Sequence, residues 1–565
     1  MLRRKFFGVF LAYALLLPTF AFAQSAQLSP TAPVKAEKVY TAPDDVIARI
    51  KDEGMNKSQV METLSYLVDV IGPRLTNSPN MKRANEWTRD TMTKWGMQNA
   101  KLEPWGPWGR GWSLRGFSAS VTEPQVFPVI AFPKAWSPST KGAVTGEVVL
   151  LDAKTEEDLL KYKGKLRGKI VLMSGVREIK ADFNGYGSRT SDEELAKMAA
   201  AQPAAPRQGG PNNNLEAALK NFQAQARRAN FLIEEGAAVL VDNSFNGTGG
   251  TVFVSGASVA SKVPETIDEI VNSRRSAWKK ESEAFMVPQM TMASEDYNRL
   301  ARMIKQGVAP KMTVDIQTQY HDDDLMGYNT VAEIPGTDPV LKNEIVMLGA
   351  HLDSWHSAGG ATDNAAGSAV AMEAARIILN SGLKPRRTIR VALWSGEEQG
   401  LNGSREYVKQ QFGEMKGGSL FGPPAPNAPK PELIKGANYD KLSVYYNLDN
   451  GTGKIRGVYM QGNEAVRPYF EAWLAPFHAN GAKTLTISNT GGTDHLSFDR
   501  IGLPGFQFIQ DEIEYSTRTH HSNQDNYDRI QADDMKQAAT IMAAFVYQSA
   551  MMDEKMPRKV TAVIP

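Results

Sequence analysis

The sequence predicts an α/β fold, in which a mainly parallel mixed sheet is flanked by helices and carries an inserted β-rich domain. From residue 329 onward, apolar runs alternate with helical patterns, which is typical of a parallel sheet covered by helices. Over residues 126–320, short apolar runs bounded by Gly and Asp predict buried strands instead. The chain of 565 residues is 42% hydrophobic, which is enough for more than one packed domain.

The N-terminus has the pattern of an export signal. Basic residues 3–5 precede an apolar run over 6–20, and Ala-Phe-Ala at 21–23 forms a small-x-small cleavage site. This run is shorter than the roughly 20 residues that span a bilayer. We therefore expect a cleaved signal peptide over 1–23, no stable membrane anchor, and a periplasmic or extracellular protein. The Ser/Pro/Ala-rich residues 24–40 predict a mobile leader.

The remaining elements follow in chain order. Apolar residues at helical spacing predict helices over residues 44–70, 82–95 and 365–379. Apolar runs predict strands over residues 146–152, 168–173, 236–242, 344–350, 388–394, 443–448 and 505–509. We expect the tryptophans between residues 103 and 125 to pack in a loop. The proline-rich stretch 417–431 is expected on the surface.

These patterns divide the mature chain into two predicted domains. Residues 41–125 and 321–555 form one discontinuous domain, and residues 126–320 form the inserted one. A polar insertion is expected within the inserted domain near residues 178–228, and its most polar part, residues 199–214, is expected to be exposed or disordered.

Charge and cysteine content exclude several classes of function. The chain has 64 Lys and Arg against 62 Asp and Glu, and three of the basic residues lie in the predicted signal. This balance gives no signature of nucleic-acid binding. The sequence contains no cysteine, which excludes thiol nucleophiles, thiolate metal sites and disulfides. Any bound metal must therefore be held by His, Asp and Glu.

Four predicted strands are each followed by a His, Asp or Glu. His351 follows the strand at 344–350, Glu397 and Glu398 follow the next strand, Asp449 follows a third, and His521 lies beyond a fourth. Ligands of open α/β sheets bind at the carboxyl ends of the strands. The sequence therefore predicts that these side chains meet in one site.

The residue types at this edge indicate a metal centre. Two imidazoles with several carboxylates suit zinc, with cobalt or manganese as possible substitutes, and a carboxylate can bridge two ions. Two metals would turn a bridging water into a hydroxide nucleophile. Of the adjacent Glu397 and Glu398, one can bind metal while the other acts as general base, and spacing alone leaves open which does which.

The ordered set of motifs resembles the co-catalytic di-zinc exopeptidases, the family of bacterial secreted aminopeptidases and of carboxypeptidase Q. The set comprises His351-Leu-Asp353, Asp363-Asn364, Gly396-Glu397-Glu398, Asp449 and His521-Ser522. The resemblance extends to Gly-Pro-Arg-Leu-Thr at 72–76 and to Asn-Thr-Val-Ala-Glu-Ile-Pro-Gly at 329–336.

The resemblance implies a role for each matching residue. His351 and Asp449 would hold one zinc ion, Glu398 and His521 the other, and Asp363 would bridge the two. Glu397 would be the general base. Two further features belong to the expected pattern: Asp353 would orient an imidazole, and the peptide bond after Asp363 would be cis.

Other polar residues near the motifs are weighed separately. His520 occupies a position that in the family often stabilises the developing oxyanion, so we expect it either to do so or simply to pack. Asp494 and His495 resemble a segment beside the family's substrate pocket. His356 matches no family ligand and is interpreted as a loop histidine.

The middle region, including 168–173, resembles a protease-associated domain, which is similar to those inserted in this family. The function implied is an exported zinc exopeptidase acting on peptide substrates, with an aminopeptidase favoured and oligomers possible. A dipeptidase or carboxypeptidase of the same family is the alternative. A glutaminyl cyclase and a non-catalytic binding ectodomain are further, weaker alternatives, because this chain keeps the whole set of five ligands and the base.

Overall fold

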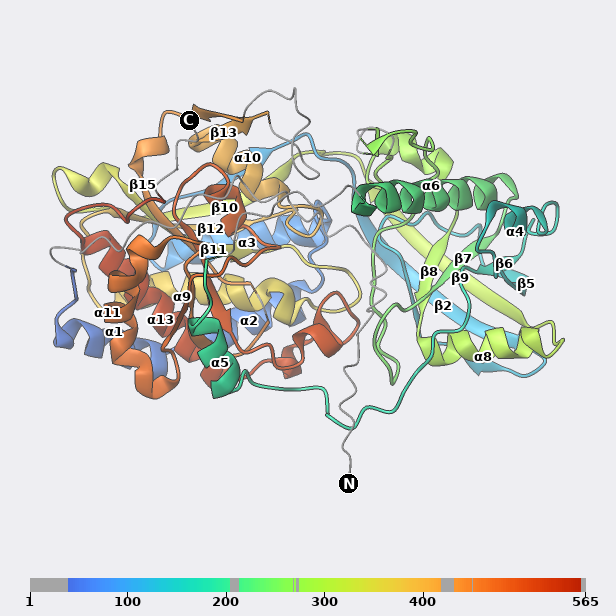
Figure 1. Cartoon of the computed structure of the whole chain (residues 1–565), viewed down its shortest axis with the longest axis horizontal. Coiled ribbons are helices and arrows are strands. Elements are labelled where there is room, and N and C mark those ends of the chain that lie inside the picture. The colour runs from blue at the N-terminus through green and yellow to red at the C-terminus, as the bar shows by residue number, and fades with distance from the viewer. Residues whose placement is uncertain are drawn as a thin grey trace.

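The computed structural model describes residues 39–203, 213–267, 269–270, 274–417, 431–449 and 451–559. The predicted signal peptide, almost all of the predicted leader, the centre of the polar tract and nearly all of the proline-rich stretch 417–431 lie outside the described residues. Figure 1 shows two bodies side by side, each built on its own sheet. Among the described helices, none is both long and apolar enough to cross a membrane.

The first body contains an eight-stranded mixed sheet. Its central four strands, β12, β11, β15 and β18, are mutually parallel, as the sequence predicts, and they pair antiparallel with β10 on one side and with β16 on the other. In sheet order the strands are β1 (Gln98–Trp105), β10 (Gly327–Ile334), β12 (Thr388–Trp394), β11 (Ile345–His351), β15 (Leu442–Asn447), β18 (Gly505–Gln510), β16 (Ile455–Tyr459) and β17 (Thr484–Thr486).

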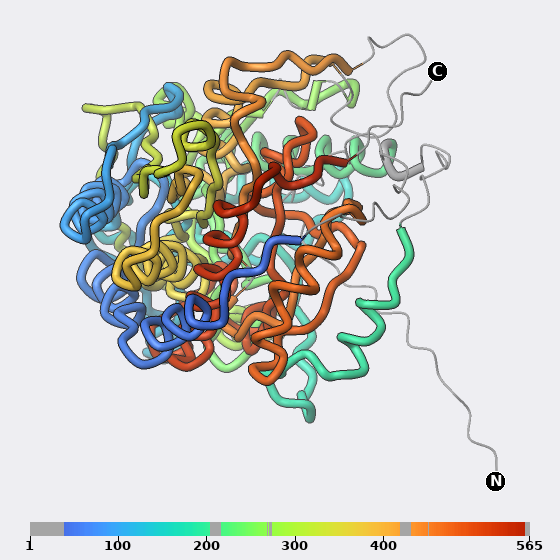
Figure 2. Tube along the Cα trace, turned by 90° about the vertical axis from the view of Figure 1, so that its left-hand side faces the viewer, coloured from blue at the N-terminus to red at the C-terminus, as the bar shows by residue number. Residues whose placement is uncertain are grey.

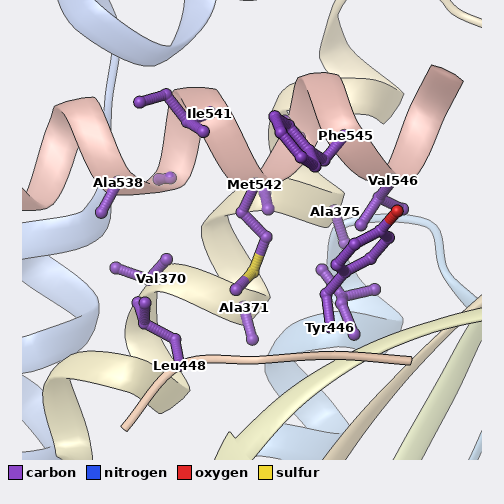
Figure 3. Packing of buried hydrophobic residues seen from close by; sticks show 14 of the residues in the cluster. Val370, Ala371, Ala375, Tyr446, Leu448, Ala538, Ile541, Met542, Phe545 and Val546 are labelled. Atoms are coloured by element: carbon purple, nitrogen blue, oxygen red, sulfur yellow. The ribbon is translucent and has the colours of Figure 1, made fainter. Parts of the chain in front are cut away.

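Helices cover both faces of this sheet. One face carries α1 (Asp44–Asn56), α2 (Val60–Ser65), α3 (Pro79–Lys94), α9 (Ala366–Asn380), α11 (Arg467–Leu474) and α13 (Ala532–Met551). The other carries α10 (Asn402–Gln411) and α12 (His495–Asp499). Figure 3 shows α13 packed through Met542 and Phe545 toward α9 and the sheet residue Tyr446. The fold class predicted from the sequence is confirmed.

Short turns and a hairpin connect these elements. The helical turns are η1 (Tyr66–Ile71), η3 (Leu341–Asn343), η4 (Ala361–Ala365), η5 (Tyr439–Lys441), η6 (Glu464–Val466), η7 (Ala475–Asn480), η8 (Tyr515–Thr519) and η9 (Tyr527–Arg529). The hairpin pairs β13 (Gly413–Lys416) with β14 (Glu432–Lys435).

The prediction of one helix over residues 44–70 is wrong, because the helix is broken between α1 and α2. Glu373 Oε1 accepts hydrogen bonds from Ser58 Oγ at 2.8 Å and from the Gln59 backbone N–H at 3.0 Å. Arg376 donates to the Lys57 carbonyl at 3.0 Å. These buried partners on α9 satisfy the backbone groups that a continuous helix would have used.

The second body contains another eight-stranded sheet. In order its strands are β3 (Phe127–Pro128), β2 (Gly111–Glu123), β9 (Lys311–His321), β5 (Val144–Leu150), β6 (Ile170–Leu172), β7 (Val239–Asn243), β8 (Gln289–Met292) and β4 (Ala131–Pro133). The helices α4 (Glu156–Leu160), α6 (Asn213–Glu234) and α8 (Ser294–Lys305) and the turn η2 (Lys280–Phe285) belong to the same stretch of chain. Strand β2 begins at residue 111, upstream of the predicted border at 126. The domain borders stay predictions.

One segment of the second body's chain crosses to the first body. Helix α5 (Asp192–Ala199) lies against β17 of the main sheet (Figures 1 and 2). Just before it, Arg189 Nη1 lies 2.9 Å from Asp511 Oδ2 and 2.7 Å from Asp534 Oδ2. We call residues 186–199 the strap.

The predicted packing of the tryptophans is confirmed, but the prediction of a loop is wrong for Trp105 and Trp112, which belong to strands β1 and β2. Trp105, Trp108 and Trp112 are all buried, and they belong to one cluster with Trp136 and Trp355. Because Trp105 ends β1 and Trp112 lies in β2, this tryptophan cluster sits where the chain passes from the first body to the second.

Candidate active site

The predicted ligands gather at one edge of the main sheet. His351 is the last residue of β11, Glu397 and Glu398 follow β12, and Asp449 follows β15. These three strands are parallel neighbours, so their carboxyl ends meet at the same edge. Asp363 lies in η4 at the start of α9, and His521 lies in the loop after η8.

The two imidazoles face opposite oxygens of one carboxylate. His351 Nε2 lies 3.2 Å from Asp363 Oδ1, and His521 Nε2 lies 3.2 Å from Asp363 Oδ2. On the first side, Asp449 Oδ1 is 3.5 Å from His351 Nε2. On the second, Glu398 Oε2 is 2.8 Å from His521 Nε2. Asp363 thus stands between two groups of donor atoms.

The donor atoms fit metal coordination. Ligand atoms about 2.1 Å from a tetrahedral zinc ion are about 3.4 Å apart, close to most of these separations. Four of the buried atoms concerned have no hydrogen-bond partner among the described residues: His351 Nε2, Asp363 Oδ2, Glu398 Oε1 and Asp449 Oδ1. Buried polar atoms are normally paired, so this set indicates a site built for a cation.

The electrostatics of the site point the same way. Burial raises the pKa of Glu398 to about 7, and it raises the pKa of Glu397 well above the usual range for a carboxyl. Burial lowers the pKa of His351, but the charges of Asp449 and Glu397 outweigh burial and raise that pKa well above its ordinary value. Crowded carboxylates without a counter-charge resist ionisation, and a bound dication reverses that effect.

Asp353 links the two adjacent strand ends. Its buried carboxylate accepts hydrogen bonds from Thr76 Oγ1 at 2.8 Å and from the backbone N–H groups of Glu397 and Glu398 at 3.3 Å each. The backbone carbonyl of Asp353 lies 3.0 Å from His351 Nδ1, and its Oδ1 lies 3.6 Å from the same nitrogen. Asp353 therefore contacts both a candidate ligand and the peptide units of the Glu pair.

Asp525 supports the backbone at the central carboxylate, and no motif in the sequence points to it. Its carboxylate accepts the N–H of Thr362 at 2.6 Å and the N–H of Asp363 at 3.1 Å. The Asp363–Asn364 peptide bond is cis, as the resemblance implied. In the sequence, Asp525 is visible only as an acidic residue four positions after His521. It has no strand or helix pattern beside it.

Arg74 is the second residue whose role the sequence did not reveal. Its buried guanidinium donates to the carbonyls of Leu352 at 2.7 Å, Gly359 at 2.7 Å and Gly360 at 2.8 Å. These carbonyls lie at the two ends of the loop that joins His351 to Asp363. Arg74 thus fixes that loop.

The other predicted residues lie around this centre. His520 Nε2 is 3.9 Å from Asp363 Oδ2, and its ring lies between those of Tyr515 and His521. Asp494 is fully buried, and burial raises its pKa to about 7. The structure does not bring His495 into the cluster, because its Nε2 lies 3.2 Å from the Thr490 carbonyl.

His356 also lies outside the cluster. Its Nε2 is 2.6 Å from the carbonyl of Pro133, in the second body. The edge of its ring meets Trp112, with ring centroids 5.2 Å apart. It is a loop histidine, as interpreted from the sequence.

Comparisons with known proteins find similarity to peptidases. Residues 329–546 match the model of peptidase family M28. Carboxypeptidase Q of Mus musculus is 26% identical over 512 residues, spanning 89% of this chain and 88% of the relative.

Two solved structures share the fold. A peptidase M28 precursor from Shewanella amazonensis superimposes with a TM-score of 0.59 at 21% identity, covering 91% of this chain and 98% of its own. A zinc aminopeptidase from Bacillus subtilis gives a TM-score of 0.52 at 17% identity, covering 88% and 96%. The matched segment, residues 329–546, contains all five predicted ligands and Glu397, so this part of the chain is similar to peptidase family M28, and the comparisons support a metallo-exopeptidase.

Proposed function

We propose that the protein is an exopeptidase that works with two zinc ions. His351 and Asp449 hold one ion, Glu398 and His521 hold the other, and Asp363 bridges them. The observation that carries this assignment is that the two oxygens of Asp363 face different imidazoles at the same distance of 3.2 Å. The Bacillus subtilis structure, described as a zinc aminopeptidase, supports the choice of metal.

Glu397 is proposed as the general base. When bound, the zinc ions supply Lewis acidity, which polarises the scissile carbonyl and makes water a better acid. Glu397 is largely buried, and its Oε2 lies 3.9 Å from His351 Nε2, so it borders the site. It accepts a proton from the attacking water and then delivers that proton to the departing amine.

His520 is proposed to donate a hydrogen bond to the oxygen of the scissile carbonyl as negative charge develops there. Its side chain is 42% exposed and stands next to Asp363, so it borders the open side of the site. A donor at this place lowers the energy of the tetrahedral state.

The end of the peptide that is recognised has two candidates. The sequence favours an aminopeptidase. The similarity to carboxypeptidase Q runs along nearly the whole of both chains and favours the alternative, a carboxypeptidase or dipeptidase of the same family. We further propose that the chain is exported through residues 1–23, that the second body is a protease-associated domain, and that Asp494 and His495 support the substrate pocket.

Hydrolysis of a substrate panel by the purified mature protein tests the proposal. The panel contains amino-acid anilides, free dipeptides, and amino-blocked peptides with free carboxyl ends, each with and without a chelator. We expect cleavage that the chelator and Glu397→Gln both abolish, whereas Glu432→Gln, the same change on the exposed hairpin, leaves it intact. The substrates cleaved identify the end recognised. Absence of all cleavage by folded, zinc-loaded protein would refute the proposal.

A further inference from the structure

The two halves of the metal centre are supported in different ways. His351 is part of β11, with strands on both sides and no exposed surface. His521 lies in an irregular loop and has a positive φ of 60°, which side chains larger than glycine rarely adopt. Something other than the main sheet must therefore hold the His521 backbone in place.

A loop of the second body pairs with the backbone around His521. The Val254 N–H donates to the His521 carbonyl at 2.8 Å, and the Asn523 N–H donates to the Val252 carbonyl at 3.1 Å. Phe253 and Ser522 form an antiparallel bridge between these bonds. The metal loop is thus paired to the second body on both sides of residue 522.

The Asn523 side chain completes this pairing. Its Oδ1 accepts the Val252 N–H at 2.7 Å, and its Nδ2 donates to the Gly250 carbonyl at 3.1 Å. Asn523 therefore binds the same second-body loop through its backbone and both ends of its amide. An aspartate would keep the acceptor and lose the donor, and an alanine would lose both.

The second-body loop is itself firmly held. Val252 and Val254 are buried in the tryptophan cluster. Ala135 N–H donates to the Ser255 carbonyl at 3.0 Å, which anchors the loop to the chain that follows β4. Trp355 of the same cluster packs beside the His521 ring, with ring centroids 5.7 Å apart. A rigid support thus reaches from the second body's core to the metal loop.

We propose that Asn523 is a positioning residue for the metal ion on the His521 side, and that the second body is thereby a structural part of the metal centre. The inference rests on the proposed di-zinc function. It requires that loss of the Asn523 bonds weakens the ion held by Glu398 and His521 and spares the ion held by His351 and Asp449.

Zinc titration against a competing chelator tests this in the mature full-length protein. Wild type is expected to bind two ions per chain. Asn523→Ala is expected to bind one with unchanged affinity and the other 10- to 100-fold more weakly, the usual range when a residue that supports a ligand is removed. Asn523→Asp, which keeps the fold with one bond fewer, is expected to weaken the same ion to a smaller extent.

Asn246→Ala is the matched control. Asn246 of the second body also bonds to the chain before His521, because its Nδ2 donates to the Ser516 carbonyl at 3.4 Å. It does not touch the backbone at His521. Its zinc titration should match wild type. With cobalt(II) in place of zinc, the visible spectrum of Asn523→Ala should differ from that of wild type only for the second equivalent of metal bound.

Hydrogen exchange of the metal-free proteins gives an independent measurement. The Val254 amide should exchange faster in Asn523→Ala than in wild type or Asn246→Ala. Two unchanged zinc affinities in folded Asn523→Ala would overturn the positioning role. If wild type itself bound no zinc, the di-zinc proposal would fail, so the two failures are distinguishable.

Discussion

Replacing Asp353 by Asn is predicted to weaken zinc binding without removing any proposed ligand. Asp353 Oδ1 accepts the Glu397 N–H and faces His351 Nδ1, whereas Oδ2 accepts the Thr76 hydroxyl and the Glu398 N–H. Whichever oxygen the amide nitrogen replaces, at least one buried N–H loses its acceptor. Such a loss costs about 1–3 kcal/mol.

That cost falls mainly on the geometry of the metal centre, because Asp353 holds the Glu397–Glu398 peptide units and lies against His351. Zinc affinity is expected to fall 10- to 100-fold, which corresponds to about 1.4–2.7 kcal/mol. Thr76→Val removes a single hydrogen bond from the same carboxylate and keeps the side-chain shape. Its effect should be smaller, about fivefold, or about 1 kcal/mol.

Competition with a chromophoric chelator measures both affinities, and circular dichroism of the metal-free proteins checks that each variant is folded. The reasoning would be refuted by a folded Asp353→Asn protein whose zinc affinity lies within threefold of wild type. It would also be refuted if Thr76→Val had the larger effect, because the carboxylate would then not be the group that matters.

Two further predictions concern stability. Met542→Ala leaves a cavity between α13 and α9 (Figure 3), so urea unfolding of the metal-free protein should show a loss of about 2–5 kcal/mol, whereas a volume-conserving Met542→Leu should lose less than about 1.5 kcal/mol. Burial lowers the pKa of His495 to about 4, below its unfolded value of about 6.5. Between these pH values the imidazole is protonated in the unfolded chain and neutral in the folded protein. The contribution of neutral His495 to the free energy of unfolding is therefore full above pH 6.5 and is lost as the pH falls toward 4. Between pH 7 and pH 5 the loss is about 2 kcal/mol, so the unfolding free energy of His495→Gln should depend less on pH by that amount. Equal pH dependence in the two proteins would contradict this prediction.

The main sheet and its ligands are predictable because their signals are local. Strands such as β12 are continuous apolar runs, and a ligand that directly follows such a run is visible in the sequence. The break between α1 and α2 is not visible, because its cause, Glu373, lies on a helix more than 300 residues away. Asp525 and Asn523 were missed for the same reason. Each acts on backbone groups that only the folded chain brings near, and neither lies in a periodic pattern.

The strap changes how the two bodies can move. An inserted domain ordinarily joins its host through two linkers, here residues 105–111 and 321–327, which would act together as a hinge. The strap adds a further crossing to the host, where its Arg189 is tied to Asp511 and Asp534. These ion pairs and the packing of α5 on β17 form a third attachment between the bodies, in addition to the two linkers. Opening of the two bodies about this hinge is therefore expected to be restricted.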